Sequence, residues 1–212
     1  MIRGNRMRNF DSALKANGGG QGTDRRFPNG VLVEGNALWN ERPRVALRPT
    51  NPIGVVGGRR WVLRGNFVAD FAHADGKRPA YAMYLKGNSR DGVIEGNLVL
   101  CEWRHAGGVR IGISLGGGGT GWRFCEAEVC STEHTGGVIR NNIVSNCPED
   151  AGIYLNKASD TVIAHNTLMN TQGIVVRYET SSARIRNNIV LDRIASRNGG
   201  IAQAESNLEL GP

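Results

Sequence analysis

The sequence predicts an all-β protein, a parallel β-helix of about six to seven coils, from three observations. One repeated sequence motif, which we call the phrase, consists of two short apolar strands on either side of an asparagine-containing pair. It occurs in residues 137–144, 161–168 and 183–190. Its asparagines, Asn142, Asn166 and Asn188, are 24 and 22 positions apart, a period typical of a solenoid. The 30 glycines and 6% aromatic residues suit tight corners and a narrow aliphatic interior.

The same phrase occurs four more times towards the N-terminus, in residues 2–5, 33–36, 63–66 and 94–97. The pair at its centre is Gly-Asn, Asn-Asn or His-Asn, as at His165. Glycine adopts positive φ freely, and Asn and His are among the other residue types most often found there. Each pair is therefore predicted to form a tight corner, with its asparagine stacked on that of the next coil.

Each coil also contains a second run of the form apolar-x-apolar, expected to build one parallel sheet along the helix. These runs are residues 45–47, 83–85, 113–115, 153–155, 174–176 and, more weakly, 201–203. Because side chains alternate across a strand, two columns should face outward. They read Ala46, Tyr84, Ser114, Tyr154, Val175, Ala202 and Arg48, Lys86, Gly116, Asn156, Arg177, Ala204. A basic stripe with two tyrosines and a glycine-floored gap suits an extended anionic polymer.

The period divides the chain into an irregular N-terminal coil or cap, residues 1–30, and a β-helix, residues 31–212, with a long insertion at about 101–135. Such insertions usually emerge on the binding face of a solenoid. The chain starts and stops within the repeat, which predicts that one or both caps are missing. The alternative is that residues 1–28 fold over the end as a cap.

Composition limits the partners. The net charge of +7 favours anionic ligands, and no apolar run is long enough for membrane insertion. The first residues lack the apolar core of a signal peptide. The glycines at 116, 118 and 121 formally match a nucleotide-binding motif, but no helix signal follows them, so a nucleotide is not expected.

The four cysteines allow a limited set of roles. Cys125 and Cys130 could bridge in an extracellular setting, whereas Cys101 and Cys147 are expected to pack inside as small apolar groups. A metal set of Cys125, Cys130 and His134 is disfavoured because paired C-x-x-C spacing is missing.

Lys86 is the main candidate for chemistry, since it is expected beside outward Tyr84, and the nearby positive charges of Arg48 and Arg110 would favour its neutral amine. Two further groups of residues are candidates for catalysis or substrate binding. The alternative interpretation of each residue is that it is an ordinary solvated surface residue. They are Ser114, Gly116, Tyr154, Asn156 and Arg177 on the sheet, and His105, Glu133 and His134 on the insertion.

Gly-Asn corners, an asparagine ladder and a basic sheet face resemble the pectate-lyase-like superfamily of right-handed parallel β-helices. Residues 80–97, with Tyr84, Lys86 and Asn88, are similar to the lysine-bearing coil of the chondroitinase B and alginate lyase type. The resemblance implies a secreted or periplasmic polysaccharide lyase with Lys86 as base. Such lyases carry an arginine on the following coil, where this strand has Gly116 and only Arg110 could substitute. The calcium that the family can use has no clear ligand set here.

The expected reaction is β-elimination on a uronic-acid polysaccharide, which needs cations at the carboxylate, a base and a proton donor. Arg48, Arg110 and Arg177 would supply the cations, Lys86 or His105 the base, and Tyr84 or Tyr154 the proton. A hydrolase would need paired carboxylates, which the two columns lack. A non-catalytic β-helix that binds polyanionic glycans, or a structural part of a larger surface protein, fits the same pattern. An acidic polysaccharide is favoured over nucleic acid.

Overall fold

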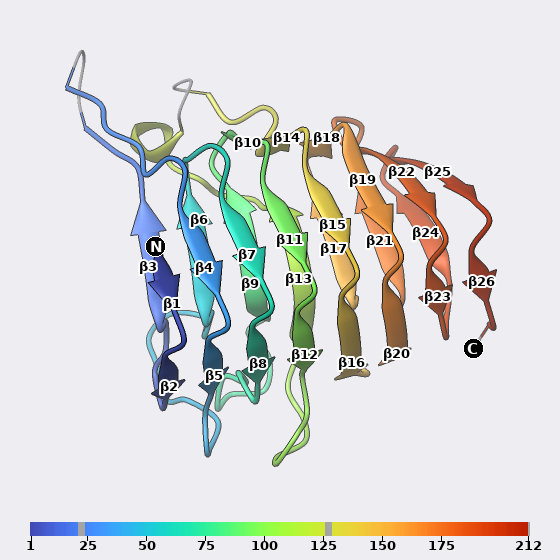
Figure 1. Ribbon diagram of the computed structural model, residues 1–212, viewed down its shortest axis with the longest axis horizontal. Coiled ribbons are helices and arrows are strands. Elements are labelled where there is room, and N and C mark those ends of the chain that lie inside the picture. The colour runs from blue at the N-terminus through green and yellow to red at the C-terminus, as the bar shows by residue number, and fades with distance from the viewer. Residues whose placement is uncertain (21–23, 126–128, 212) are drawn as a thin grey trace.

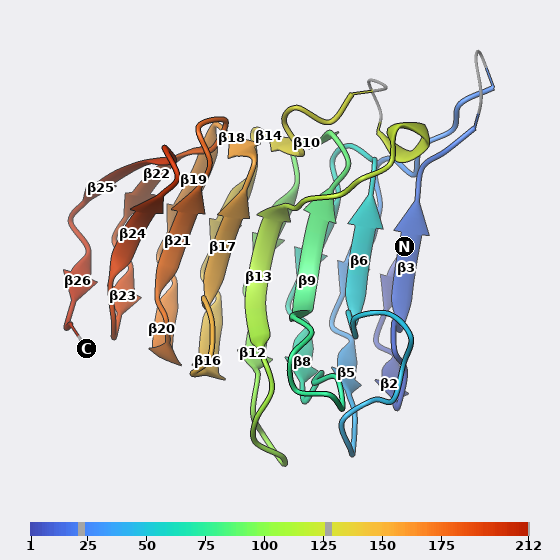
Figure 2. The same cartoon turned by 180° about the vertical axis from the view of Figure 1, so that it is seen from behind.

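The computed structural model describes residues 1–20, 24–125 and 129–211. The chain winds as a parallel β-helix with three long sheets, which confirms the predicted fold class. In Figure 1 the strands at the front run downward and those behind run upward as the chain advances from N to C, so the coil is right-handed; Figure 2 shows the rear strands directly.

We name the sheets by their place in Figure 1. The front sheet contains β1 (Ile2–Arg3), β4 (Leu32–Glu34), β7 (Val62–Arg64), β11 (Val93–Glu95), β15 (Val138–Arg140), β19 (Thr161–Ala164), β22 (Ser182–Arg186) and β25 (Ile201–Glu205). The lower sheet contains β2 (Arg6–Arg8), β5 (Ala37–Trp39), β8 (Phe67–Ala69), β12 (Leu98–Leu100), β16 (Ile143–Cys147), β20 (Thr167–Thr171), β23 (Ile189–Val190) and β26 (Leu208–Glu209).

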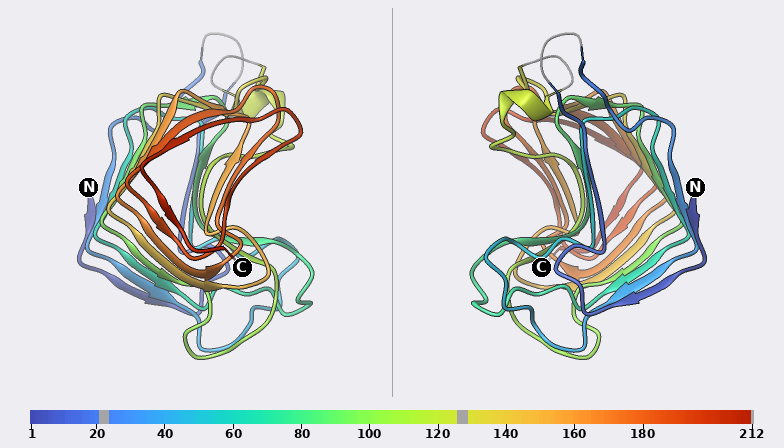
Figure 3. Two further views of the ribbon diagram at one scale, coloured as in Figure 1. Left: turned by 90° about the vertical axis from the view of Figure 1, so that its right-hand side faces the viewer. Right: turned by 90° about the vertical axis from the view of Figure 1, so that its left-hand side faces the viewer.

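The rear sheet contains β3 (Leu14–Asn17), β6 (Ile53–Val56), β9 (Ala80–Lys86), β13 (Arg110–Gly116), β17 (Ile153–Asn156), β21 (Ile174–Arg177) and β24 (Ile194–Arg197). A short upper sheet is formed by β10 (Ser89–Arg90), β14 (His134–Thr135) and β18 (Ala158–Ser159), and one 3₁₀ turn, η1, spans Trp122–Phe124. Figure 3 looks along the helix axis and shows loops bordering the rear sheet at both ends of its strands.

An asparagine ladder joins the coils at the corner between the front and lower sheets. Each side-chain oxygen accepts from the backbone N and from Nδ2 of the preceding asparagine at 2.9–3.0 Å, which confirms the predicted stacking. Its members are Asn5, Asn36, Asn66, Asn97, Asn142, Asn166, Asn188 and Asn207. The residue before each has a φ of 53–68°. Asn207, preceded by Ser206, is an eighth copy that the repeated phrase did not reveal.

The interior is filled by rows of aliphatic side chains, one from each front strand and two from most rear strands. The front sheet contributes the row Val33, Leu63, Ile94, Ile139, Ile163 and Ile185, and the rear sheet contributes Ile53, Met83, Ile113, Ile153 and Ile174, all fully buried. Each such side chain stabilises the fold by roughly 1.5–3 kcal/mol relative to exposure. The spacing at which apolar residues recur in the sequence is thus the number of residues in one coil, because each coil adds one layer of side chains to the core.

Two of the predicted rear strands are wrong. Residues 45–47 form no strand, and Val45 and Leu47 are 91% and 97% exposed; β6, with all four residues buried, takes their place. Residues 201–203 belong to β25 in the front sheet, and β24 closes the rear sheet instead. An apolar-x-apolar pattern marks a strand but does not say with which run of the neighbouring coil it pairs.

The insertion and the N-terminal segment also differ from expectation. The insertion is divided by β13 into residues 101–109 and 117–133, which lie at opposite ends of that strand. In the N-terminal segment, β1, β2 and β3 pair with β4, β5 and β6 as a regular coil. Residues 21–23 and 126–128, within these two segments, lie outside the described residues.

Candidate functional site

The outer face of the rear sheet carries two columns of side chains in parallel register. The first reads Lys15, Gly54, Tyr84, Ser114, Tyr154, Val175 and Ala195. The second reads Asn17, Val56, Lys86, Gly116, Asn156, Arg177 and Arg197. The predicted members from Tyr84 to Val175 and from Lys86 to Arg177 keep their order in the columns, whereas Ala46, Arg48, Ala202 and Ala204 are not in them.

Tyr84 lies across its neighbouring strand and reaches Lys15. Its hydroxyl is hydrogen-bonded to Lys15 Nζ, and the ring centroid is 5.0 Å from Lys15 Nζ and 5.7 Å from Lys86 Nζ. The ring occupies space that Gly54 leaves open, because a Cβ on Gly54 would lie 2.7 Å from Tyr84 Oη. The side chain faces away from the core yet is only 7% exposed, and this burial raises the pKa of the Tyr84 hydroxyl.

Lys15 is a functional candidate that our sequence analysis missed. It lies on the edge strand β3, and desolvation of its amine, with the Arg48 guanidinium nearby, lowers the pKa of Lys15. The signal was present, since Leu14-Lys15-Ala16 has the apolar-x-apolar form of a rear strand. It was overlooked because residues 1–30 were expected to be irregular.

Lys86 borders two adjoining cavities beside Tyr84, of about 210 and 170 Å³. Its Nζ donates to the Gly118 carbonyl at 3.2 Å, on a glycine loop that closes over the strand end. The first cavity is lined by Lys15, Asn17, Arg48, Val56, Tyr84, Lys86, Gly119, Thr120, Gly121 and Phe124. The second is lined by Pro49, Asn51, Tyr81, Tyr84, Lys86, Gly116, Gly117 and Gly118. These linings bring three cations to Tyr84, and none of the described residues in them carries a carboxylate.

Glu133 and His134 do not face this surface, contrary to expectation. Glu133 is 2% exposed, and its Oε2 accepts from Gly87 N and Thr120 Oγ1, both at 2.8 Å. Glu133 thereby connects the glycine loop to the residue that follows β9. His134 is fully buried where Gly92 and Gly137 leave room for its ring, and desolvation lowers its pKa to about 3.

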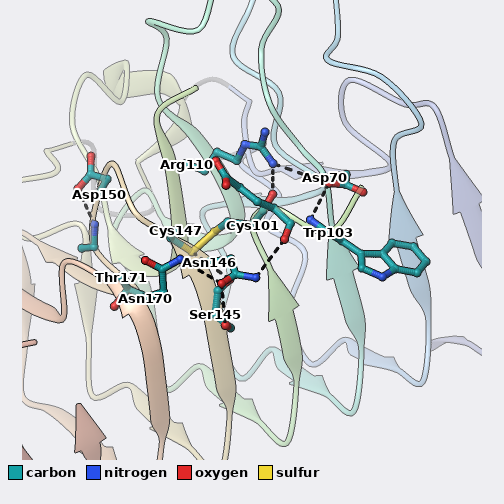
Figure 4. The surroundings of a disulfide bond; sticks show 12 residues. Asp70, Cys101, Trp103, Arg110, Ser145, Asn146, Cys147, Asp150, Asn170 and Thr171 are labelled. Atoms are coloured by element: carbon teal, nitrogen blue, oxygen red, sulfur yellow. Dashed lines mark hydrogen bonds and ion pairs between the residues drawn. A yellow bond between two sulfur atoms is a disulfide. The ribbon is translucent and has the colours of Figure 1, made fainter. Parts of the chain in front are cut away.

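Arg110 and His105 are likewise not on the predicted face, and Figure 4 shows the reason for Arg110. Its guanidinium is 1% exposed, donates to the Cys101 carbonyl and to Gly107 O, and lies 3.8 Å from Asp70 Oδ1. His105 Nδ1 is 3.2 Å from the same guanidinium, and burial lowers the pKa of His105. Both residues hold the loop of residues 101–109, at the opposite strand end from Lys86.

A disulfide joins Cys101 to Cys147 beneath this loop, so the expectation of two separate interior thiols is wrong (Figure 4). Both cysteines follow equivalent positions of the lower sheet in adjacent coils, β12 and β16, which brings them together. A second disulfide joins Cys125 to Cys130, the pair for which a bridge was considered.

A second polar cluster lies two strands beyond Lys86. Arg177 Nη1 donates to Tyr154 Oη at 3.1 Å, and Asn156 Nδ2 donates to the same oxygen at 3.4 Å. Tyr154 is 8% exposed, so its hydroxyl end rather than its ring is available. Between the clusters, Ser114 and Gly116 are buried, and they form the floor of the gap without projecting from it.

Asp150 is a carboxylate near the sheet face that the two predicted columns did not include. Desolvation raises its pKa, partly offset by a hydrogen bond from Ala151 N and by the charges of Arg197 and Arg177. Among the described residues that line the two cavities beside Tyr84, none is acidic. Those residues therefore do not supply the carboxylate pair that a hydrolase uses.

The chain was compared with known proteins. Residues 121–208 match the model of a family described as periplasmic copper-binding protein (NosD). No curated protein and no solved structure matches. The matched segment covers the last coils, from the glycine loop to the final turn of the asparagine ladder.

Among the described residues, no group of three or more His, Cys, Asp or Glu side chains is placed to hold an ion. All four cysteines are in disulfides. The described residues therefore offer no such ligand group for copper, nor for the calcium that the lyase resemblance allows. Across the described ranges, no helix has the length and apolar character needed to span a membrane.

Proposed function

We propose that this protein binds an acidic, uronate-containing polysaccharide along the outer face of the rear sheet and cleaves it by β-elimination beside Tyr84. The observation that supports this most is the contact of Lys15 Nζ with Tyr84 Oη, with Lys86 and Arg48 lining a cavity whose described residues include no carboxylate. An amine of lowered pKa beside a hydroxyl of raised pKa provides a base and an acid in one place.

The roles follow from these pKa shifts. Lys15 is assigned as the base, because desolvation and the Arg48 charge favour its neutral amine. Tyr84 stays protonated at neutral pH and is assigned as the proton donor. Lys86 and Arg48 would neutralise the substrate carboxylate, which makes the neighbouring C5 proton acidic enough to remove.

The reaction balances with these groups alone. Lys15 takes the C5 proton, the C5–H electron pair becomes the C4=C5 double bond, and the C4–O bond breaks. The departing oxygen takes the proton of Tyr84. No external oxidant or second substrate is needed, and the product is an unsaturated uronate at the new chain end.

A non-catalytic module that binds polyanionic glycans remains the alternative, and the match to a family whose name specifies binding favours it. Copper, the ligand in that family's name, is not carried over, because the described residues offer no ligand group for it. A periplasmic or secreted location agrees with the family name and with the two disulfides, which are typical of oxidising compartments.

The test is incubation with hyaluronan, chondroitin sulfate, alginate and pectate, while the ultraviolet absorbance of the unsaturated uronate is followed. Tyr84→Phe and Lys15→Ala should each lower the rate by about 10²–10⁴-fold. Arg184→Ala removes one exposed charge from the front sheet and should leave the rate unchanged. Binding of a polymer without any product would support the non-catalytic alternative.

A further inference from the structure

After five of the seven rear strands, the next residue turns the chain into the upper corner with a positive φ. This holds for Gly57 (69°), Gly87 (79°), Lys157 (58°), Tyr178 (75°) and Asn198 (49°). Glycine takes this conformation without steric cost, whereas a side-chain-bearing residue does not, and a bulky one is a genuine outlier. The corner is thus built from glycine in two early coils and from three side-chain-bearing residues in the last three.

The three side chains line a single cavity of about 510 Å³. Ser131, Glu179 and Thr180 complete its lining. The ring of the half-buried residue Tyr178 has two cations near it, Arg177 Cζ at 4.6 Å and Lys157 Nζ at 6.0 Å from its centroid. These are cation–π distances, so the ring and the charges form one surface.

The corner is held rigidly by its backbone. Tyr178 N donates to Arg197 O at 3.0 Å, and Ser181 N donates to Tyr178 O at 2.8 Å. Ser181 Oγ in turn accepts from Ala158 N at 3.1 Å, which joins this turn to the preceding coil. A tyrosine is therefore kept in a costly conformation on a rigid turn, and nothing in the core packing of the described residues requires its ring there. Strain of this kind is found where a side chain has a function.

We propose that this corner is a second glycan-binding site, in which Tyr178 stacks on a sugar ring while Lys157 and Arg177 bind its carboxylate or sulfate. The ligand class rests on the proposed function, whereas the site is distinct from the centre at Tyr84 and Lys15. Glu179 also lines the cavity and is exposed. The site extends the rear-sheet face, because Arg177 also contacts Tyr154 on that face.

The test uses Tyr178→Gly, which removes the ring and relieves the backbone strain together. We expect an equal or higher melting temperature and at least about tenfold weaker binding of alginate, pectate and chondroitin sulfate oligosaccharides by calorimetry. His165→Gly relieves a positive φ of 57° at a remote corner and should leave binding unchanged. A ring needed only for folding would give the opposite pattern, a lower melting temperature with unchanged binding, and would overturn the proposal.

Two further measurements keep the result decisive. If Tyr178→Gly fails to fold, binding is measured with two other variants. Tyr178→Asn removes the ring and tolerates positive φ, and Lys157→Gly removes a flanking cation. Full binding by both variants would overturn the proposal. The two proposals fail differently. Binding that depends on Tyr178 without any unsaturated product contradicts the lyase alone, whereas product formation with Tyr178-independent binding contradicts the second site alone.

Discussion

The ring of Tyr84 lies over Gly54, on the neighbouring strand, at a distance that leaves no room for a methyl group. A Cβ on Gly54 would approach Tyr84 Oη to 2.7 Å and Cζ to 2.8 Å, on the path by which Tyr84 reaches Lys15. This relationship makes the candidate centre dependent on a residue without a side chain, and it gives the first prediction.

Gly54→Ala should displace the Tyr84 hydroxyl from Lys15 and lower kcat by about 10²-fold, the cost of a misplaced reacting group. The fold should persist, because the ring faces away from the core. Gly118→Ala is the matched control in the same site, since a Cβ there meets nothing within 4 Å. Equal activities of the two variants, measured with the best polymer, would contradict the role of Tyr84.

The activity should rise with pH through the pKa of Lys15. A base must be deprotonated, and the pKa of Lys15 is lowered from 10.5 by desolvation and by Arg48. Arg48→Ala removes the second of these causes and should shift the acidic limb of the kcat/KM profile to higher pH. A profile that does not move in this variant would show that another group is the base.

Asn97→Ala should destabilise the helix by about 2–5 kcal/mol, because it leaves buried partners unsatisfied on both neighbouring coils. Asn97 Oδ1 accepts from Asn66 N and Nδ2, and Asn97 Nδ2 donates to Leu63 O and Asn142 Oδ1. Asn5→Ala, at the exposed start of the ladder, should cost less than 1 kcal/mol. Urea unfolding measures both, and similar losses would indicate that the ladder does not stabilise the corner.

Acid should destabilise the protein through His134. Its pKa is about 3 in the fold and about 6.5 unfolded, so the unfolded state takes up the proton first. Stability is therefore constant above about pH 6.5 and falls towards pH 3 by up to roughly 1.4 kcal/mol per pH unit. His134→Leu should flatten this slope in unfolding experiments between about pH 4 and 7. His165→Asn, at an exposed corner, should retain the slope.

Removing the Cys101–Cys147 disulfide should cost more stability than removing Cys125–Cys130. The sequence separations are 46 and 5 residues, and loop-closure entropy then gives roughly 4 and 2 kcal/mol. Double alanine variants of each pair, compared by thermal unfolding, provide the measurement. The reverse order would mean that native-state contacts of the loops outweigh the entropy of the unfolded chain.

Several elements could be read from the sequence because their causes are local. Positive φ at His165 or Asn187 depends on the residue and its neighbours, and the inward aliphatic residues of each strand give the period of the core. The ladder from Asn5 to Asn188 follows from these two requirements. The strand at residues 45–47 could not be judged in this way, because β6, which begins eight residues after Val45, offered a longer apolar run for the same place.

What the sequence alone determined is therefore the coil, its corners and the basic character of one face. The tertiary structure decided which side chains meet. It brought Lys15 to Tyr84 across 69 residues, and it buried Arg110, Glu133 and His134, which by type alone suggested a surface site. The physical reason is that the residue type of a charged side chain is the same whether it contacts a ligand or stabilises a loop. Only the residues that pack against it distinguish these two roles.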